Sequence, residues 1–183
     1  MLKQALITLG KLCLFKAKPQ DLGFSMVTFY VTIVVNLVIL AYSMSGQAGI
    51  AMGTMAAAVF VGVLLGYMFL LLKGFKLHSR FVQTATAILG CNALMMLVAI
   101  VISFALVALM NTNIELSVMV LLSRVLMLTI FIWTIAIMSF IFKNALERNW
   151  LIAGLSAIFM LVAANLSVTI LLQLLLQNVP IAN

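Results

Sequence analysis

Five long apolar runs limit what this chain can fold into. They cover residues 24–44, 51–72, 82–110, 118–142 and 151–176. Each is about as long as the 20 or so apolar residues with which a helix crosses a bilayer. Because hydrocarbon offers no water to backbone N–H and C=O groups, such runs cross as α-helices. The sequence therefore predicts an all-α integral membrane bundle of about five transmembrane helices.

The composition excludes an ordinary soluble domain. Hydrophobic residues make up 67% of the chain and charged residues 7%, against about 45–50% and about 25% in soluble proteins. The formal net charge of +7 raises the question of nucleic-acid binding, but the basic residues lie between apolar runs and form no continuous basic face. We therefore expect lipid around much of the surface, and no nucleic acid.

The basic residues lie in alternate connections between the runs. Apart from Arg124, every Lys and Arg falls in residues 1–20, 73–80 or 143–148, and the other two connections hold none. Short connections rich in Lys and Arg stay on the cytoplasmic side. The sequence thus predicts a cytoplasmic N-terminus and a C-terminus outside. The short loops and the charge asymmetry favour a bacterial inner membrane, with the C-terminus in the periplasm.

Residues 1–20 predict a separate segment before the five-helix domain, which covers residues 21–183. On a helical projection one face is apolar and the opposite face carries most of the lysines. This pattern is typical of an amphipathic helix on the membrane surface, with lysines toward anionic headgroups. The alternative is a partly ordered cytoplasmic tail.

Residues that could carry chemistry are scarce. The single histidine, His78, lies in a basic connection, and the three acidic residues all lie at the ends of runs. Cys13 and Cys91 have neither a metal-ligand nor a redox spacing, which favours a packing role. General acid–base catalysis needs partners that this pattern does not supply. We therefore expect no enzymatic activity, no cofactor and no metal site.

Seven basic residues are candidate contacts with lipid or a protein partner: Lys3, Lys11, Lys18, Lys73, Lys76, Arg80 and Arg124. Arg124 differs from the others because it lies about seven residues into the fourth run, roughly 10 Å deep. An arginine at that depth is costly unless it reaches the surface or finds a partner. Two interpretations stay open: a site for an anionic headgroup or substrate, or a side chain that extends to the outer surface, toward Glu115.

Two sets of residues are candidates for helix packing. Asn36, Asn92 and Asn165 fall near the middle of the first, third and fifth runs, where amides bond across helices. They would fix the packing or line a polar path. The second set, Ala58, Gly62 and Gly66, forms a stripe of small residues at spacings of four. Such a stripe allows close helix approach, either inside the bundle, the interpretation we favour, or with another subunit.

Three stretches resemble the Yip1 family, and the small bacterial Yip1-like proteins most of all. They are residues 18–22 before the first run, residues 80–84 at the start of the third, and residues 133–146 at the end of the fourth. The resemblance implies a bundle of five membrane helices that spans nearly the whole chain. It implies no catalytic residues and no particular activity.

Together these features predict a non-enzymatic membrane protein. We expect a scaffold, an assembly factor or an accessory subunit that binds other membrane proteins or lipid. Its expected partners are anionic headgroups on the cytoplasmic side and a membrane protein or further copies of itself. The alternative is a small transporter or lipid translocator that works as an oligomer, with Arg124 and the asparagines along its path.

Overall fold

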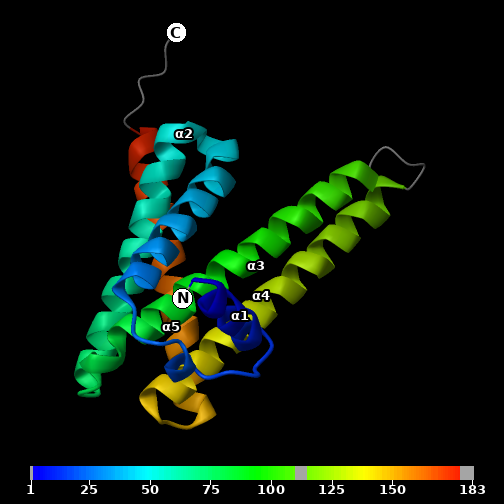
Figure 1. Cartoon of the computed structure of the whole chain (residues 1–183). Helices are drawn as coiled ribbons and strands as arrows, with labels where there is room; N and C mark the ends of the chain where they lie inside the picture. Colours follow the sequence, from blue (N-terminus) through cyan, green and yellow to red (C-terminus); the bar gives the residue numbers. More distant parts are fainter. Residues whose placement is uncertain (1, 110–114, 178–183) are drawn as a thin grey trace.

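The chain is all-helical in the computed structural model, which describes residues 2–109 and 115–177 (Figure 1). No strand occurs in these residues. The α-helices are α1 (Leu2–Cys13), α2 (Met26–Gly74), α3 (Phe81–Leu109), α4 (Leu116–Leu146) and α5 (Trp150–Gln177). Two short 3₁₀ turns, η1 (Pro19–Asp21) and η2 (His78–Arg80), precede α2 and α3.

Five helical segments of the described chain are long and apolar enough to cross a membrane. They are Met26–Gly46, Gly49–Gly74, His78–Leu109, Ser117–Leu146 and Trp150–Leu175. Each overlaps one predicted run, so the all-α fold with five candidate spans is confirmed. Residue 110, the predicted end of the third run, lies outside the described residues. The side of the membrane at which each terminus lies stays a prediction.

The first two spans belong to one helix, α2, which turns back on itself. Gly49 is its non-helical residue, with φ 82° and ψ 164°, a conformation that glycine adopts readily. At Gly53 the two halves approach so closely that a Cβ would lie 2.8 Å from the backbone nitrogen of Ser45. The break thus lies within residues 45–50, where the sequence predicts a connection between two spans. It consists of a single non-helical residue and not of a six-residue loop.

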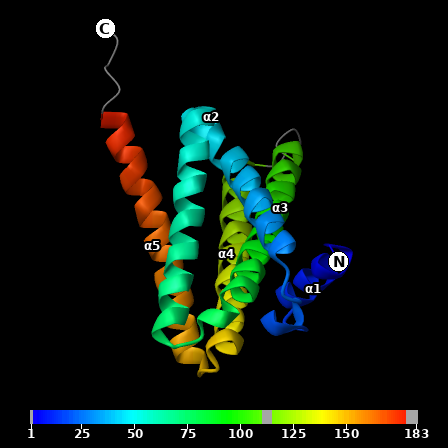
Figure 2. The same cartoon turned by 60° about the vertical axis from the view of Figure 1, so that its left-hand side comes forward.

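The four long helices form a ring of contacts. α2 packs against α3 and α5, and α4 packs against α3 and α5 (Figure 2). The largest fully buried side chains come from α1 to α5: Leu12, Asn36, Leu64, Met68, Leu72, Ile88, Leu89, Ile137, Met138, Ile141, Phe142 and Met160. In α3 these buried side chains lie in the N-terminal half, and in α4 they lie in the C-terminal half. The core therefore lies toward the end of the bundle that contains the start of α3 and the end of α4.

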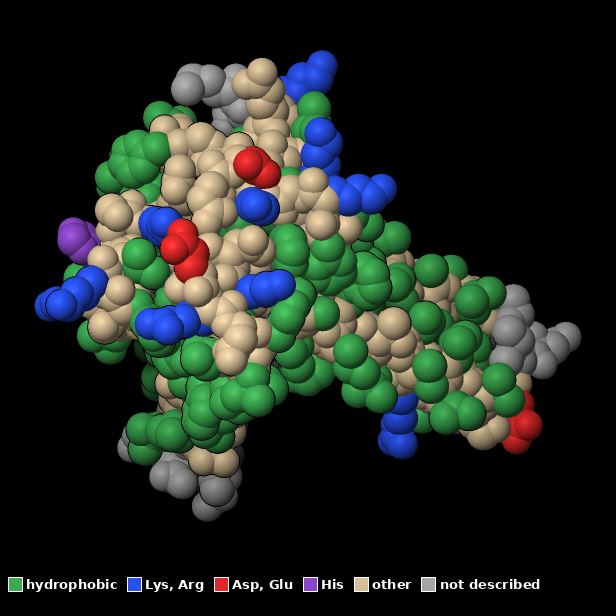
Figure 3. Space-filling model, turned by 90° about the horizontal axis from the view of Figure 1, so that it is seen from below, with side chains coloured by type: hydrophobic (Ala, Val, Ile, Leu, Met, Phe, Trp, Pro, Cys, Tyr) green, Lys and Arg blue, Asp and Glu red, His purple; other side chains and the backbone are tan. Residues whose placement is uncertain are grey.

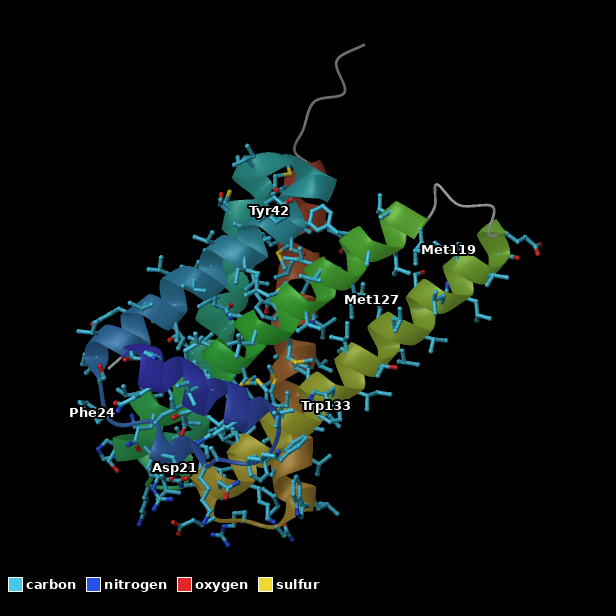
Figure 4. All side chains as sticks on the ribbon, turned by 45° about the vertical axis from the view of Figure 1, so that its right-hand side comes forward. Asp21, Phe24, Tyr42, Met119, Met127 and Trp133 are labelled. Carbon is cyan, nitrogen blue, oxygen red and sulfur yellow. The ribbon has the colours of Figure 1, made fainter. Side chains whose placement is uncertain are left out.

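The rest of α3 and α4 forms an arm, here defined as residues 94–109 and 117–136. It diverges from α2 and α5 in Figures 1 and 4. Of its described side chains only Leu106 and Met119 are buried, and both line one cavity between the two helices. At 1.5 Å per residue the two helices are each more than about 40 Å long. Near its base the arm still contacts the core and α1, through Leu94 and Trp133 for example. Farther out its two helices pack on each other, and most of their large apolar side chains are exposed.

The three asparagines do not act as one set. Asn36 is fully buried, and its Nδ2 donates a 2.8 Å hydrogen bond to the carbonyl oxygen of Leu89. Asn92 is also buried, and no hydrogen bond is formed by its Nδ2 or by Oδ1 of Asn36 within the described part of the chain. Asn165 is exposed and donates to Leu161 of its own helix. Of the three, Asn36 is the one with a hydrogen bond to another helix in the described part of the chain.

The stripe of Ala58, Gly62 and Gly66 faces outward. All three are exposed, and a Cβ added to either glycine would meet nothing within 4 Å. The core side of this helix is formed by Leu64 and Met68, two residues along from each glycine and so about 200° around the helix. The stripe therefore does not pack inside the bundle, which was the interpretation we favoured, and its three residues are exposed instead.

Replacing Asn36 by Leu will destabilise the bundle, because the bond from the first span to α3 is lost. We expect the free energy of unfolding to fall by about 0.6–1.7 kcal/mol, the range for hydrogen bonds between membrane helices. Unfolding in a graded series of denaturing detergent measures it. The matched control is Asn165→Leu, which we expect to stay within about 0.5 kcal/mol of the parent. Equal losses in the two variants would contradict the assignment.

Candidate functional site

Lysines and arginines gather at one end of the molecule, as Figure 3 shows from below. We call this the basic end and define it by six residues: Lys18, Lys73, Lys76, Arg80, Lys143 and Arg148. They lie just before η1, at the end of α2 and in the connection to α3, and at the end of α4 and in the connection to α5. The connections that the sequence assigns to one side of the membrane therefore do lie together.

Arg80 holds two of these connections together. Its Nη2 lies 2.6 Å from Oε1 of Glu147, and its Nη1 donates a 3.2 Å hydrogen bond to the carbonyl oxygen of Ala145. Glu147 ends α4 in a left-handed conformation, which turns its side chain out of the helical series. Arg80, a candidate for external contacts, thus has an internal role as well.

The segment before α2 is fixed against the end of α4. Gln20 Nε2 donates a 2.8 Å hydrogen bond to the carbonyl oxygen of Asn144, and Asp21 Oδ2 accepts one of 2.7 Å from the backbone N–H of Lys18. Pro19, which begins this turn, and Leu22, which follows it, are both buried. These contacts bring Lys18 beside the α4–α5 connection, although about 125 residues separate them along the chain.

Aromatic rings hold several cations of the basic end in place. Lys143 Nζ lies 4.5 Å from the ring centroid of Trp150, and the Arg148 guanidinium lies 5.6 Å from that of Phe75. A cation over a ring face is attracted by the ring's electron density, by about 0.5–1 kcal/mol at exposed sites. The rings thus restrict where these two side chains can point.

The N-terminal helix α1 rests on the bundle. Leu9 and Leu12 are buried, and the Leu9 side chain lies where a Cβ on Gly90 of α3 would be, at 2.6 Å. Trp133 of α4, labelled in Figure 4, donates a 3.1 Å hydrogen bond from Nε1 to the carbonyl oxygen of Cys13. Part of the predicted apolar face of α1 therefore packs against the helix bundle and is not available to lipid. Contact of α1 with a membrane surface stays a prediction.

Lys3, Lys11 and Lys18 are all exposed, as the surface-helix prediction requires, and so are Lys73 and Lys76. Arg80 is half-buried by its contacts.

Arg124 lies apart from all of these, on the arm. It is exposed, and no carboxylate of the described residues lies within 4 Å of it. Glu115 is nine residues away, about 13 Å along the helix, which is too far for an ion pair. Arg124 and the asparagines therefore do not line one path.

The structure brings two cysteines together that the sequence did not connect. Cys13 on α1 and Cys91 on α3 are both free thiols. A hydrogen bond from the Cys91 side chain lowers the pKa of the Cys13 thiol from its ordinary value. The Cys91 thiol also lies 3.9 Å from the carbonyl oxygen of Leu9. A separation of 78 residues gives no spacing signal, so only the docking of α1 reveals this pair.

Two adjacent cavities lie where α1 meets the first span and α3. One, of about 160 Å³, is apolar and extends to Leu94 and Leu97. The other, of about 300 Å³, has a mixed lining that includes both Asp21 and Phe24. Ala5 and Thr28 line both.

Comparisons with known proteins add no assignment: no family model, no curated protein and no solved structure matches the chain. The resemblance to Yip1-like proteins therefore rests on the sequence stretches alone. Within residues 2–109 and 115–177, no three His, Cys, Asp or Glu side chains are placed to hold a metal ion.

Gly90→Val will displace α1 from α3, because the added side chain occupies the space of Leu9. Overpacking typically costs about 1–3 kcal/mol, so we expect Cys13 to react with a maleimide about tenfold faster. The rate is measured with Cys91 replaced by Ala, and adding Leu9→Ala is expected to restore it. Gly154→Ala is the control, since its Cβ would make an ordinary contact 3.9 Å from Ser139 Oγ. An unchanged rate in Gly90→Val would contradict the docking.

Proposed function

We propose that the chain is a non-enzymatic membrane protein that binds other membrane helices, as a scaffold, an assembly factor or an accessory subunit. The arm supports this proposal best. Its side chains are large and apolar on the outer faces, with Val101 66% exposed and Leu121 63% exposed. A two-helix arm that leaves the core on one side offers these faces to a partner helix.

The stripe of Ala58, Gly62 and Gly66 supports the same function. In lipid, helix association has little hydrophobic driving force and depends on close packing, which small residues allow. A second helix could approach this stripe closely because no described atom lies within 4 Å of a Cβ added to either glycine. The partner is another membrane protein or a further copy of the chain.

We infer that the basic end faces the cytoplasm. The excess of Lys and Arg there follows the positive-inside rule. In this orientation the exposed lysines of α1 and of the α2–α3 connection meet anionic headgroups. The C-terminus then lies on the opposite side, the periplasm of a bacterial inner membrane. A Yip1-like bundle would have the same five spans.

The alternative, a lipid translocator, has one observation in its favour. Two cavities that share Ala5 and Thr28 lie side by side, one apolar and the other partly polar, as a lipid with its headgroup would require. Translocation also needs a polar path across the membrane, and the exposed Arg124 lies on the arm, away from these cavities. We therefore place lipid handling second.

Photo-cross-linking tests the proposal. A photoreactive residue is placed at Val101 or Leu121 on the arm, and at Leu166 on α5 as a control of similar exposure. After irradiation in native membranes, we expect discrete protein adducts from the arm positions and only lipid adducts from Leu166. The adduct mass separates a second copy of the chain from another protein. Lipid adducts alone at all three positions would overturn partner binding by the arm and favour lipid handling.

A further inference from the structure

A cavity of about 440 Å³ opens at the basic end, where η1 meets the α4–α5 connection. It is lined by polar and charged residues only: Lys18, Gln20, Lys143, Asn144, Glu147 and Arg148. Its size lies within the roughly 300–1,000 Å³ of small-molecule sites. Lys143 and Arg148 were not among the candidate contact residues, because the sequence does not show that Lys18 lies beside them.

The lining carries an excess of positive charge. Three of its side chains are cations, and its one carboxylate, Glu147, is paired at 2.6 Å with Arg80, which lies outside the lining. None of the three cations has a carboxylate within 4 Å among the described residues. The cavity therefore holds three positive charges that the protein itself does not neutralise.

The cations are held in place while their N–H groups stay available. Trp150 and Phe75 contact Lys143 and Arg148 through their ring faces, and an ammonium or guanidinium has three or five N–H donors. The hydrogen bond from Gln20 to Asn144 fixes the two walls against each other. A site whose groups are already positioned loses less entropy when it binds.

We propose that this cavity binds a phosphate group. Arginine offers a fork of donors that matches phosphate oxygens, and each lysine adds a compact positive charge. The phosphate belongs either to an anionic phospholipid headgroup or to a free phosphorylated molecule at the membrane surface. The site is separate from the outer faces of the arm, so the inference goes beyond partner binding and does not depend on it.

The test measures binding to full-length protein in nanodiscs. Phosphatidic acid in a phosphatidylcholine bilayer is the lipid probe, and glycerol 3-phosphate with phosphatidylcholine alone is the free probe. Binding of phosphatidic acid that excess glycerol 3-phosphate does not displace assigns a lipid headgroup. Binding of glycerol 3-phosphate itself assigns a free ligand. Failure of both probes to bind the parent protein overturns the proposal.

Variants then locate the site. We expect the double variant Lys143→Gln, Arg148→Gln to weaken binding about tenfold or more, because charge-assisted hydrogen bonds are lost. The control is Lys16→Gln, which removes one exposed charge just outside the cavity and is compared with Lys18→Gln inside it. We expect Lys16→Gln to change binding by about twofold or less. Equal losses in Lys16→Gln and Lys18→Gln would show general surface attraction and overturn the site.

Lys18→Gln is a second variant that is expected to fold normally. The Lys18 side chain is exposed, and the hydrogen bond that fixes its turn comes from the backbone N–H. We expect this variant to weaken binding with the helical circular dichroism unchanged. Full retention of affinity in both Lys18→Gln and the Lys143, Arg148 variant would overturn the proposal. Cross-linking from the arm is expected to be the same in all these variants, which separates failure of this site from failure of partner binding.

Discussion

Inside a bilayer the backbone has no water to bond, so each crossing segment must satisfy its own N–H and C=O groups as a helix. The long helices α2 to α5 meet this requirement over their apolar lengths. The same constraint leaves the charged residues at the ends: every cation but Arg124 lies outside the candidate spans or at their limits. A polar end and an apolar body follow, and the rest of the architecture is built on that division.

The two ends of the bundle differ in how they are held. At the basic end the connections are joined by the Arg80–Glu147 pair, the bond from Gln20 to Asn144 and the rings beneath Lys143 and Arg148. These contacts form where polar groups meet water and headgroups. Toward the other end α3 and α4 leave the core as the arm, since their buried residues there are limited to Leu106 and Met119. One end thus presents charged groups, and the other presents exposed apolar faces of two helices.

Much of the fold could be predicted from the sequence because run length encodes a span directly. A break between residues 44 and 51 was also expected, but not that it consists of one non-helical residue, because the sequence does not mark the length of a connection. The docking of α1 on the bundle could not be predicted for a different reason. Leu9 and Leu12 indicate an apolar face, but such a face can be buried either in lipid or against protein. The outward direction of Gly62 and Gly66 depends on the side of the helix that the core occupies, which spacing does not reveal.

The candidate site was predictable only as a collection of charges. Alternate connections rich in lysine and arginine indicated one basic face, and the structure does gather them. That Lys18 shares a cavity with Lys143 and Arg148 depends on the path of η1, which local sequence does not determine. Arg80 shows the converse, because its main contacts are with residues of the chain itself.

The central claim is that the chain crosses the membrane five times with the basic end in the cytoplasm. Single cysteines at exposed positions test it most directly, in a chain with Cys13→Ala and Cys91→Ala: Ser79→Cys at the basic end and Gly46→Cys at the reversal of α2. A membrane-impermeant maleimide on intact spheroplasts should label Gly46→Cys and should reach Ser79→Cys only after lysis. Labelling of Ser79→Cys before lysis, with Gly46→Cys protected, would contradict the account.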